Sequence, residues 1–174
     1  MTSSKSIYKN KYTEVLVDTL KLDGHEWEHV YLIKPNKKGV GVIPLDAEGI
    51  YLVNQYRHPI RSFLWQLPMG MIDIGMSEEE TVRQELLEEA GFKAKHLTRI
   101  GSFFAEPGVI DQEQVVYVAE KLKAVEQKPE ETEVGMKVKH FTFAEINSMI
   151  LNGELQCGFT LSSLLLFNKI YLKK

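Results

Sequence analysis

Three glutamates near the middle of the chain have the clearest capacity for chemistry. Glu85, Glu88 and Glu89 stand at positions i, i+3 and i+4, so a helix through them places their carboxylates side by side. From Glu78 to Glu89 there are six glutamates and one arginine, a local charge of −5. Like charges at i and i+4 destabilise a helix by roughly 0.2–0.5 kcal/mol per pair. A divalent cation would offset this repulsion, since Mg²⁺ binds carboxylate and phosphate oxygens; the alternative is a solvated acidic face.

The residues around these glutamates predict the helix that must carry them. Ser77 and Glu80 form the Ser-x-x-Glu pattern of a capping box, which begins a helix. Gly91 stands where a helix commonly ends on a glycine. We therefore expect a helix from about Glu78 to Ala90. Its core-facing side is formed by apolar residues at helical spacing, namely Val82, Leu86 and Ala90.

The region from Gly70 to Phe92 resembles the Nudix box. That motif reads Gly, five residues, Glu, seven residues, Arg-Glu, an apolar residue, any residue, Glu-Glu, any residue, Gly and an apolar residue. The positions in register here are Gly70, Glu85, Leu86, Glu88, Glu89, Gly91 and Phe92. Agreement at so many fixed spacings over 23 residues identifies the chain as a member of the Nudix hydrolase superfamily.

Two positions depart from the motif. Met76 stands in place of the first glutamate, and Gln84 stands in place of the arginine. Glutamine can still donate hydrogen bonds but cannot neutralise charge. Arg83 does not simply replace the arginine, because one step along a helix rotates the side chain by about 100°. The departures bear on rate and metal affinity more than on the family.

Sequences outside the box are similar to the ADP-ribose pyrophosphatase branch. Gln55-Tyr56-Arg57 matches its Gln-x-Arg strand end, and Gln66-Leu67-Pro68-Met69-Gly70 matches its Glu-x-Pro-Ala-Gly run. Gln66 stands for the glutamate of that run and Met69 for the alanine. Pro107, 16 residues beyond Gly91, fits a proline typical of the branch. The alternative for Pro107 is an ordinary Pro-Gly turn.

The resemblance implies metal-dependent hydrolysis of the pyrophosphate of a nucleoside diphosphate derivative. ADP-ribose would give AMP and ribose 5-phosphate, and nucleotide sugars are also expected substrates. Two adjacent phosphates repel an incoming nucleophile, so Mg²⁺ or Mn²⁺ is expected to neutralise their oxygens and activate water. The metal ligands that the resemblance implies are Glu85, Glu89, Glu88 and the backbone carbonyl of Met69.

The remaining site residues follow from the same resemblance. Glu133 is expected to accept the proton or to orient the water, with Glu88 as a further catalytic residue; the alternative is that Glu130, Glu131 and Glu133 belong to a solvated loop. Arg57 is expected to contact a substrate phosphate, unless it forms a surface ion pair. The other candidates for substrate contact are Trp27 and Tyr31, which can stack on a base or simply pack, and Glu113, which is also a reserve proton acceptor.

Elements on either side of the helix define the expected fold. Helices are expected at Ala144–Leu151 and Leu161–Tyr171. A hairpin is expected at Asp23-Gly24, and a second pair of strands is expected at Val40–Pro44 and Ile50–Arg57. Other expected strands are Tyr12–Leu22, Trp27–Ile33, Phe63–Leu67, Leu97–Phe104, Gln114–Leu122 and Val134–Thr142. They predict an α/β fold: a Nudix-type α/β/α sandwich with a mixed sheet, plus N-terminal antiparallel strands.

Two regions are expected along the chain. Residues 1–39 form an N-terminal β lobe, which the resemblance implies joins two subunits into a homodimer. Residues 40–174 form the Nudix hydrolase domain.

Composition narrows the remaining classes. The chain has 174 residues, of which 44% are hydrophobic and 26% charged, with a net charge of −3. This charge gives no footprint for a nucleic acid polymer. Cys157 is the only cysteine and there is no apolar run of membrane-spanning length, so we expect a cytoplasmic protein. The rival functions are a Nudix enzyme for other nucleotides, a catalytically weak or dead nucleotide-binding regulator, and a scaffold with an acidic helix.

Overall fold

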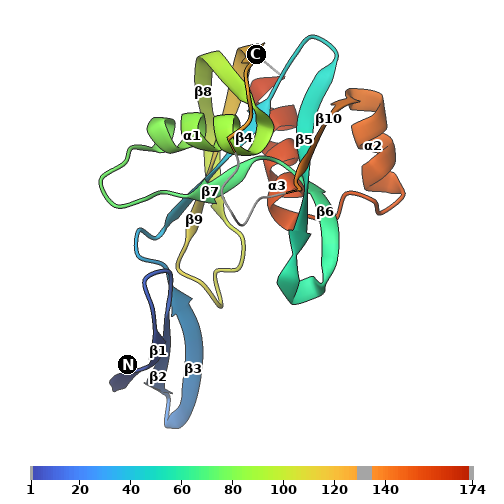
Figure 1. Ribbon diagram of the computed structural model, residues 1–174. Helices are drawn as coiled ribbons and strands as arrows, with labels where there is room; N and C mark the ends of the chain where they lie inside the picture. The colour runs from blue at the N-terminus through green and yellow to red at the C-terminus, as the bar shows by residue number, and fades with distance from the viewer. Residues whose placement is uncertain (1, 129–134, 173–174) are drawn as a thin grey trace.

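The computed structural model describes residues 2–128 and 135–172 (Figure 1). The strands in these ranges are β1 (Ser3–Lys9), β2 (Glu14–Leu22), β3 (His25–Ile33), β4 (Lys38–Pro44), β5 (Gly49–Arg57), β6 (Ser62–Gln66), β7 (Met69–Met71), β8 (Phe92–Phe104), β9 (Glu113–Ala124) and β10 (Lys137–Thr142). The helices are α1 (Glu78–Ala90), α2 (Phe143–Leu151) and α3 (Gly158–Leu166), with a 3-10 turn at His58–Ile60 and a π-helical segment at Phe167–Tyr171. None of the helices in the described ranges is both long and apolar enough to cross a membrane.

The first three strands form a sheet of their own, which we call the N-terminal lobe. The predicted hairpin is confirmed: β2 and β3 are joined at Asp23 and Gly24, whose positive φ values of 51° and 82° suit a tight turn. Strand β1 was not expected, because its sequence is polar and alternates weakly.

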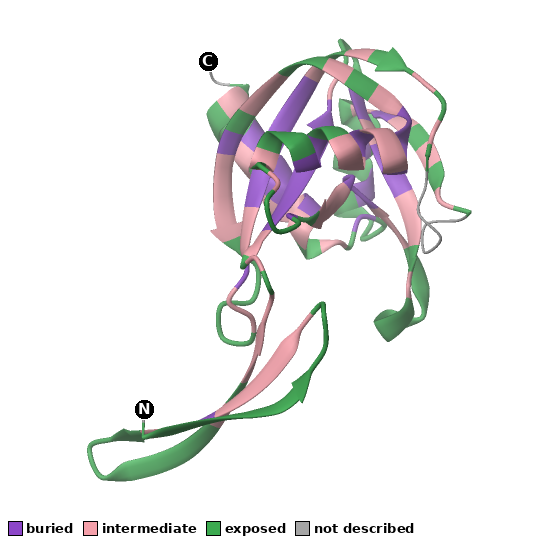
Figure 2. Cartoon of the chain, turned by 60° about the vertical axis from the view of Figure 1, so that its left-hand side comes forward, coloured by how far each residue is buried: buried purple, intermediate pink, exposed green. Residues whose placement is uncertain are grey.

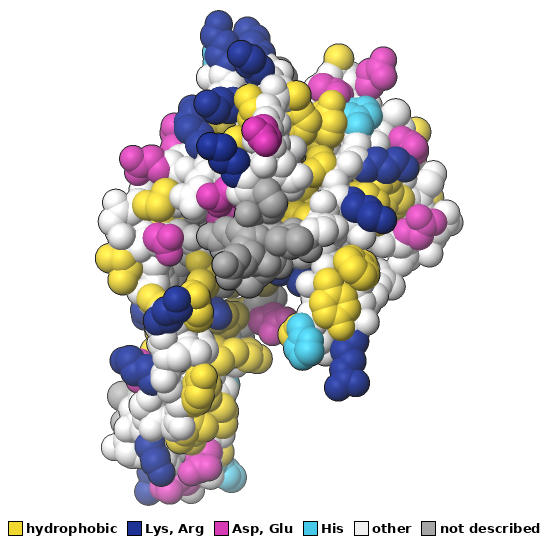
Figure 3. Space-filling model, viewed as in Figure 1, with side chains coloured by type: hydrophobic (Ala, Val, Ile, Leu, Met, Phe, Trp, Pro, Cys, Tyr) yellow, Lys and Arg dark blue, Asp and Glu magenta, His cyan; other side chains and the backbone are white. Residues whose placement is uncertain are grey.

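The lobe extends away from the rest of the molecule (Figure 1) and carries apolar side chains along its surface (Figure 3). Its exposed large residues are Ile7, Tyr8, Leu22, Trp27 and Val30, with Tyr12 at the turn between β1 and β2. A surface of this kind suits contact with another chain. The homodimer stays a prediction.

The body of the molecule is built from strands that are apolar on both faces. Sheet β7-β4-β9-β8 is mixed, since β4 and β9 run parallel, and sheet β10-β5-β6 is antiparallel. Side chains alternate between two buried clusters: Val42 and Val53 belong to the cluster under α1, whereas Ile43 and Leu52 belong to the cluster under α2 and α3. Figure 2 shows these buried residues concentrated in the body. The two cores make the α/β/α sandwich.

The expected pairing of β4 with β5 is wrong. Strand β4 lies between β7 and β9, and β5 lies between β10 and β6. A single bridge, from Leu45 to Ile50, joins the two segments. Both strands are buried on both faces, so each takes a central position in a different sheet where neighbours satisfy its backbone on both edges.

Helix α1 has the bounds that its sequence predicts. Ser77 and Glu80 form the capping box, and Gly91 ends the helix with φ 68°. The apolar face is buried against β4, β9 and Val53 of β5. This packing turns the carboxylate face of α1 away from the core and toward β7.

Helix α3 is tied to the segment that leads into β7. The backbone N–H of Leu67 donates to the Oγ1 of Thr160 at 3.0 Å, and both residues are fully buried. A buried N–H without a partner is destabilising, so this hydroxyl helps to fix the chain between β6 and β7.

We expect Thr160→Val to lower the free energy of unfolding by about 1–3 kcal/mol, because the buried N–H of Leu67 loses its acceptor while side-chain volume is kept. Thr160→Ser retains the hydroxyl and should be destabilised less. Urea unfolding of the three proteins measures the difference. Equal stability of Thr160→Val and the unaltered chain would show that this hydrogen bond contributes nothing.

Candidate active site

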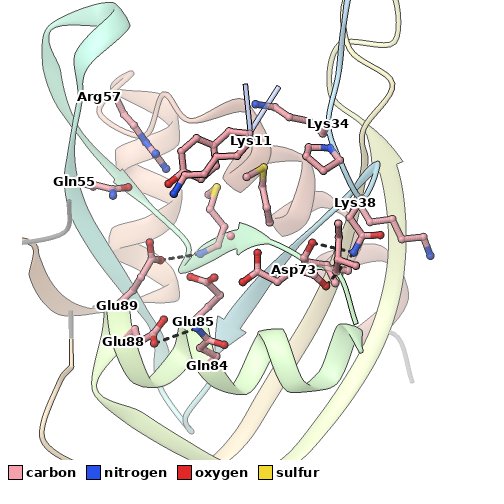
Figure 4. Close-up of a pocket in the computed structure, with 18 residues that line it drawn as sticks. Lys11, Lys34, Lys38, Gln55, Arg57, Asp73, Gln84, Glu85, Glu88 and Glu89 are labelled. Atoms are coloured by element: carbon pink, nitrogen blue, oxygen red, sulfur yellow. Dashed lines mark hydrogen bonds between the residues drawn. The ribbon is translucent and has the colours of Figure 1, made fainter. Parts of the chain in front are cut away.

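A cavity of about 730 Å³ lies between α1, β7 and the chain on either side of the N-terminal lobe. One wall, which we call the acidic wall, consists of Glu85, Glu88 and Glu89 from α1 (Figure 4). Across the cavity lies the basic wall, formed by Lys11, Lys34 and Arg57 (Figure 4). The cavity therefore has opposite charges on its two sides.

Glu89 is the most buried member of the acidic wall. Its side chain is 2% exposed, and its Oε2 accepts a hydrogen bond of 2.8 Å from the backbone N–H of Met69. Burying a carboxylate is expensive unless it is hydrogen-bonded and paired with a cation or a metal. The sequence predicts this arrangement only in part, because spacing places Glu89 on a helix face but does not reveal β7 beside it.

Glu85 meets the glycine that opens the motif. A Cβ added to Gly70 would collide with the Glu85 carboxylate. The absence of a side chain at Gly70 lets this carboxylate lie directly against the backbone of β7. The requirement here is for close approach, since the φ of Gly70 is not in the left-handed region.

The two departures from the motif have separate surroundings. Gln84 lines the cavity, and its Nε2 donates to Oε1 of Glu88 at 3.2 Å. Met76 packs against the apolar cluster under α1. Arg83 points elsewhere and donates to the backbone oxygen of Ala94 at 2.9 Å, which confirms that it does not replace an arginine at position 84.

A hydrogen-bonded chain of three side chains supports the basic wall. Arg57 Nε donates to Oε1 of Gln66 at 2.9 Å, and Nε2 of Gln66 donates to Oε1 of Gln55 at 2.8 Å. Gln66 is fully buried, whereas Arg57 and Gln55 line the cavity. Strand pairing between β5 and β6 brings these three residues together.

Sequence reasoning missed Lys11, Tyr12 and Lys34. The turn between β1 and β2 carries Lys11 and Tyr12 to the cavity, and Oδ1 of Asn10 accepts from the N–H groups of Tyr12 and Thr13. Lys11 Nζ lies 4.5 Å from the centre of the Tyr12 ring. Nothing in the local sequence marks these residues as functional, because only the fold brings the turn near α1.

The start of α1 is anchored by ion pairs. Glu78 contacts Lys38 at 2.9 Å and Arg99 at 3.1 Å, and Tyr117 donates to it at 3.2 Å. Burial acts to raise the pKa of Glu78, but these partners together lower it below its ordinary value. Burial, followed by the nearby Glu78 charge, raises the pKa of Tyr117 to about 12. This network joins α1 to β4, β8 and β9.

Other predicted residues lie apart from the cavity. Trp27 is on the exposed surface of the lobe, Tyr31 stacks with His29 at 5.9 Å, and Glu113 lies 3.7 Å from Lys38. None of the three lines the cavity in the described part of the chain. Their roles stay predictions. Glu130, Glu131 and Glu133 lie outside the described residues.

The acidic wall has the chemistry to hold a divalent cation. Within residues 2–128 and 135–172, no group of three or more His, Cys, Asp or Glu side chains is already arranged as a metal site. Mg²⁺ is commonly held by one or two carboxylates together with substrate phosphates and waters. The half-buried Glu85 and Glu88 and the buried Glu89, all facing one cavity, fit such a shared ion.

Comparison with known sequences bears on this cavity. Residues 35–155 match the family model described as the NUDIX domain. The ADP-ribose pyrophosphatase of Bacillus subtilis is 31% identical over 129 residues, which cover 74% of this chain and 69% of that protein. The ADP-ribose pyrophosphatase of Mycobacterium tuberculosis is 33% identical over 120 residues, which cover 67% of this chain but only 58% of that protein.

A solved structure shares the fold. The crystal structure of an ADP compounds hydrolase aligns with a TM-score of 0.87 and covers 99% of this chain and 92% of that one. At 20% sequence identity this likeness speaks to the fold alone. It confirms the predicted α/β sandwich with N-terminal antiparallel strands.

We expect Gly70→Ala to reduce the turnover of a nucleoside diphosphate substrate by about 10²-fold, the order of loss that follows a 1 Å displacement of a catalytic group. The added Cβ displaces the Glu85 carboxylate. Gly158→Ala is the matched control, because a Cβ there meets nothing within 4 Å. Steady-state kinetics, with thermal unfolding of both variants, makes the comparison. Unchanged turnover in Gly70→Ala would separate Glu85 from the reaction.

Proposed function

The chain belongs to the NUDIX domain family of hydrolases, and from this premise we propose that it hydrolyses the pyrophosphate bond of ADP-ribose. The products are AMP and ribose 5-phosphate. Two relatives that carry the name ADP-ribose pyrophosphatase support this substrate. Other nucleotide sugars share the diphosphate on which the proposal depends.

The observation that carries the proposal is the pair of opposed walls. A diphosphate is anionic at its oxygens and requires positive charge around it before water can attack. Arg57 and the lysines of the basic wall supply such charge from one side, and the acidic wall can hold a divalent cation on the other. Among the described residues, no ion pair engages Lys11, Lys34 or Arg57.

Each residue of the cavity has a distinct task in this proposal. Glu85, Glu88 and Glu89 hold Mg²⁺ or Mn²⁺, with the Met69 carbonyl as a further ligand. The bound ion neutralises phosphate oxygens and lowers the pKa of water. Arg57 binds a phosphate through its remaining N–H groups. Gln84 keeps Glu88 oriented through its hydrogen bond.

Hydrolysis requires a proton acceptor. A water oxygen forms a bond to one phosphorus while the bond from that phosphorus to the bridging oxygen breaks, and the water proton passes to a carboxylate. We assign this task to Glu133, with Glu88 as the alternative in the cavity. Tyr12 is also placed to contact the nucleoside, since its ring lines the cavity at the turn of the lobe.

The proposal is tested by Glu89→Gln in a Mg²⁺-dependent assay that quantifies AMP and ribose 5-phosphate. We expect kcat to fall by about 10²-fold or more, because loss of metal-assisted charge stabilisation has effects of this order. Glu79→Gln is the control: it removes an exposed carboxylate of the same helix that does not line the cavity.

Two results would contradict the proposal. One is full activity of the unaltered chain in the presence of a chelator. The other is turnover of Glu89→Gln equal to that of Glu79→Gln. Nucleotide sugars assayed in parallel show whether ADP-ribose is the preferred member of the class.

A further inference from the structure

Gln66 lies behind the cavity and connects two residues that line it. Its side chain is fully buried on β6. It accepts from Arg57 Nε at 2.9 Å and donates to Gln55 Oε1 at 2.8 Å. A buried amide with both groups engaged is held in one orientation.

Hydrogen-bond chemistry gives this chain of side chains a direction. A guanidinium has only donors, so the group of Gln66 that faces Arg57 must be its oxygen. The amide nitrogen of Gln66 then faces Gln55 and requires the oxygen of Gln55 as its acceptor. Gln55 is left with its own NH₂ group as a donor. Both ends of the chain, at Arg57 and at Gln55, therefore present N–H groups.

The charge of Gln66 is as important as its direction. Arg57 is held by a neutral oxygen, so the hydrogen bond fixes the guanidinium without cancelling its charge. A carboxylate at the same position would hold Arg57 equally well but would form an ion pair with it. Figure 4 shows Arg57 and Gln55 on the same side of the cavity, across from the acidic wall.

We propose that Gln66 is a positioning residue that makes this part of the cavity a donor-only, positively charged cradle for a phosphate of the substrate. The proposal rests on the proposed function for the identity of that substrate. It adds the reason why Arg57 attracts an anion although its Nε is already occupied. The ligand atoms beside Arg57 and Gln55 are accordingly anionic oxygens.

Gln66→Glu tests the proposal, because it keeps size and shape and changes charge. The new carboxylate accepts from Arg57 and, once the Gln55 amide turns over, from Gln55 as well. Gln55 then presents an oxygen where it presented a nitrogen. We expect KM for ADP-ribose to rise by about tenfold or more with kcat changed by less than about threefold, the pattern of lost ground-state and transition-state binding.

A double-mutant cycle separates positioning from a merely structural effect. In an Arg57→Gln background, Gln66→Glu should change KM by less than about twofold, because the charge to be cancelled is gone. Gln66→Met, which removes both hydrogen bonds without adding charge, should raise KM in the Arg57 protein only. Thermal unfolding monitors each variant. If Gln66→Glu does not fold, Gln66→Met carries the same cycle.

Binding of inorganic pyrophosphate in metal-free buffer, measured by calorimetry, makes the two proposals distinguishable. If the unaltered chain does not hydrolyse ADP-ribose, the proposed function fails, yet Gln66→Glu should still weaken pyrophosphate binding by about tenfold. Pyrophosphate binding that is equal in the unaltered chain and in a folded Gln66→Glu would overturn the assignment of Gln66. A KM effect that persists in the Arg57→Gln background would also overturn it.

Discussion

The contact between the buried carboxylate of Glu89 and the backbone N–H of Met69 is the interaction on which the site depends. It joins α1 to β7 at the point where the helix turns its charged face to the cavity. A carboxylate that is 2% exposed needs hydrogen bonds and positive charge nearby. The close approach of Glu85 to Gly70 repeats the same demand one helical turn earlier. Helix and strand can lie this close only because both sit on the same apolar cluster.

The two sheets of the body bring charges of opposite sign to the two sides of one cavity. The sheet that contains β4 and β7 supports α1 and its carboxylates, whereas β5 and β6 carry Arg57 and the residues that hold it. Ion pairs at Glu78 fix the beginning of α1 to the same sheet. Neither wall alone would suit a diphosphate, because the acidic wall repels it and the basic wall cannot activate water. Their separation across a cavity of about 730 Å³ gives both functions room.

Local sequence predicted α1 and its ends well, because a capping box, helical spacing and a C-terminal glycine all act within a few residues. It failed for β4 and β5, whose partners lie far along the chain and whose apolar runs look alike. The acidic wall could be predicted for the same reason as α1. The basic wall could be predicted only at Arg57, since Lys11 and Lys34 reach the cavity through the placement of the lobe. Glu89 differs from Glu79 on the same helix in burial, which spacing alone does not determine.

A crystal structure with Mg²⁺ and the non-hydrolysable α,β-methylene analogue of ADP-ribose tests the central claim most directly, namely that a metal-bound diphosphate lies between the two walls. We expect the metal on carboxylates of Glu85 and Glu89, and at least one phosphonate oxygen within hydrogen-bond distance of the Arg57 guanidinium. An analogue bound instead in the separate hollow lined by Tyr51 and Phe92, or a metal that leaves Glu85 and Glu89 without contact, would contradict the account.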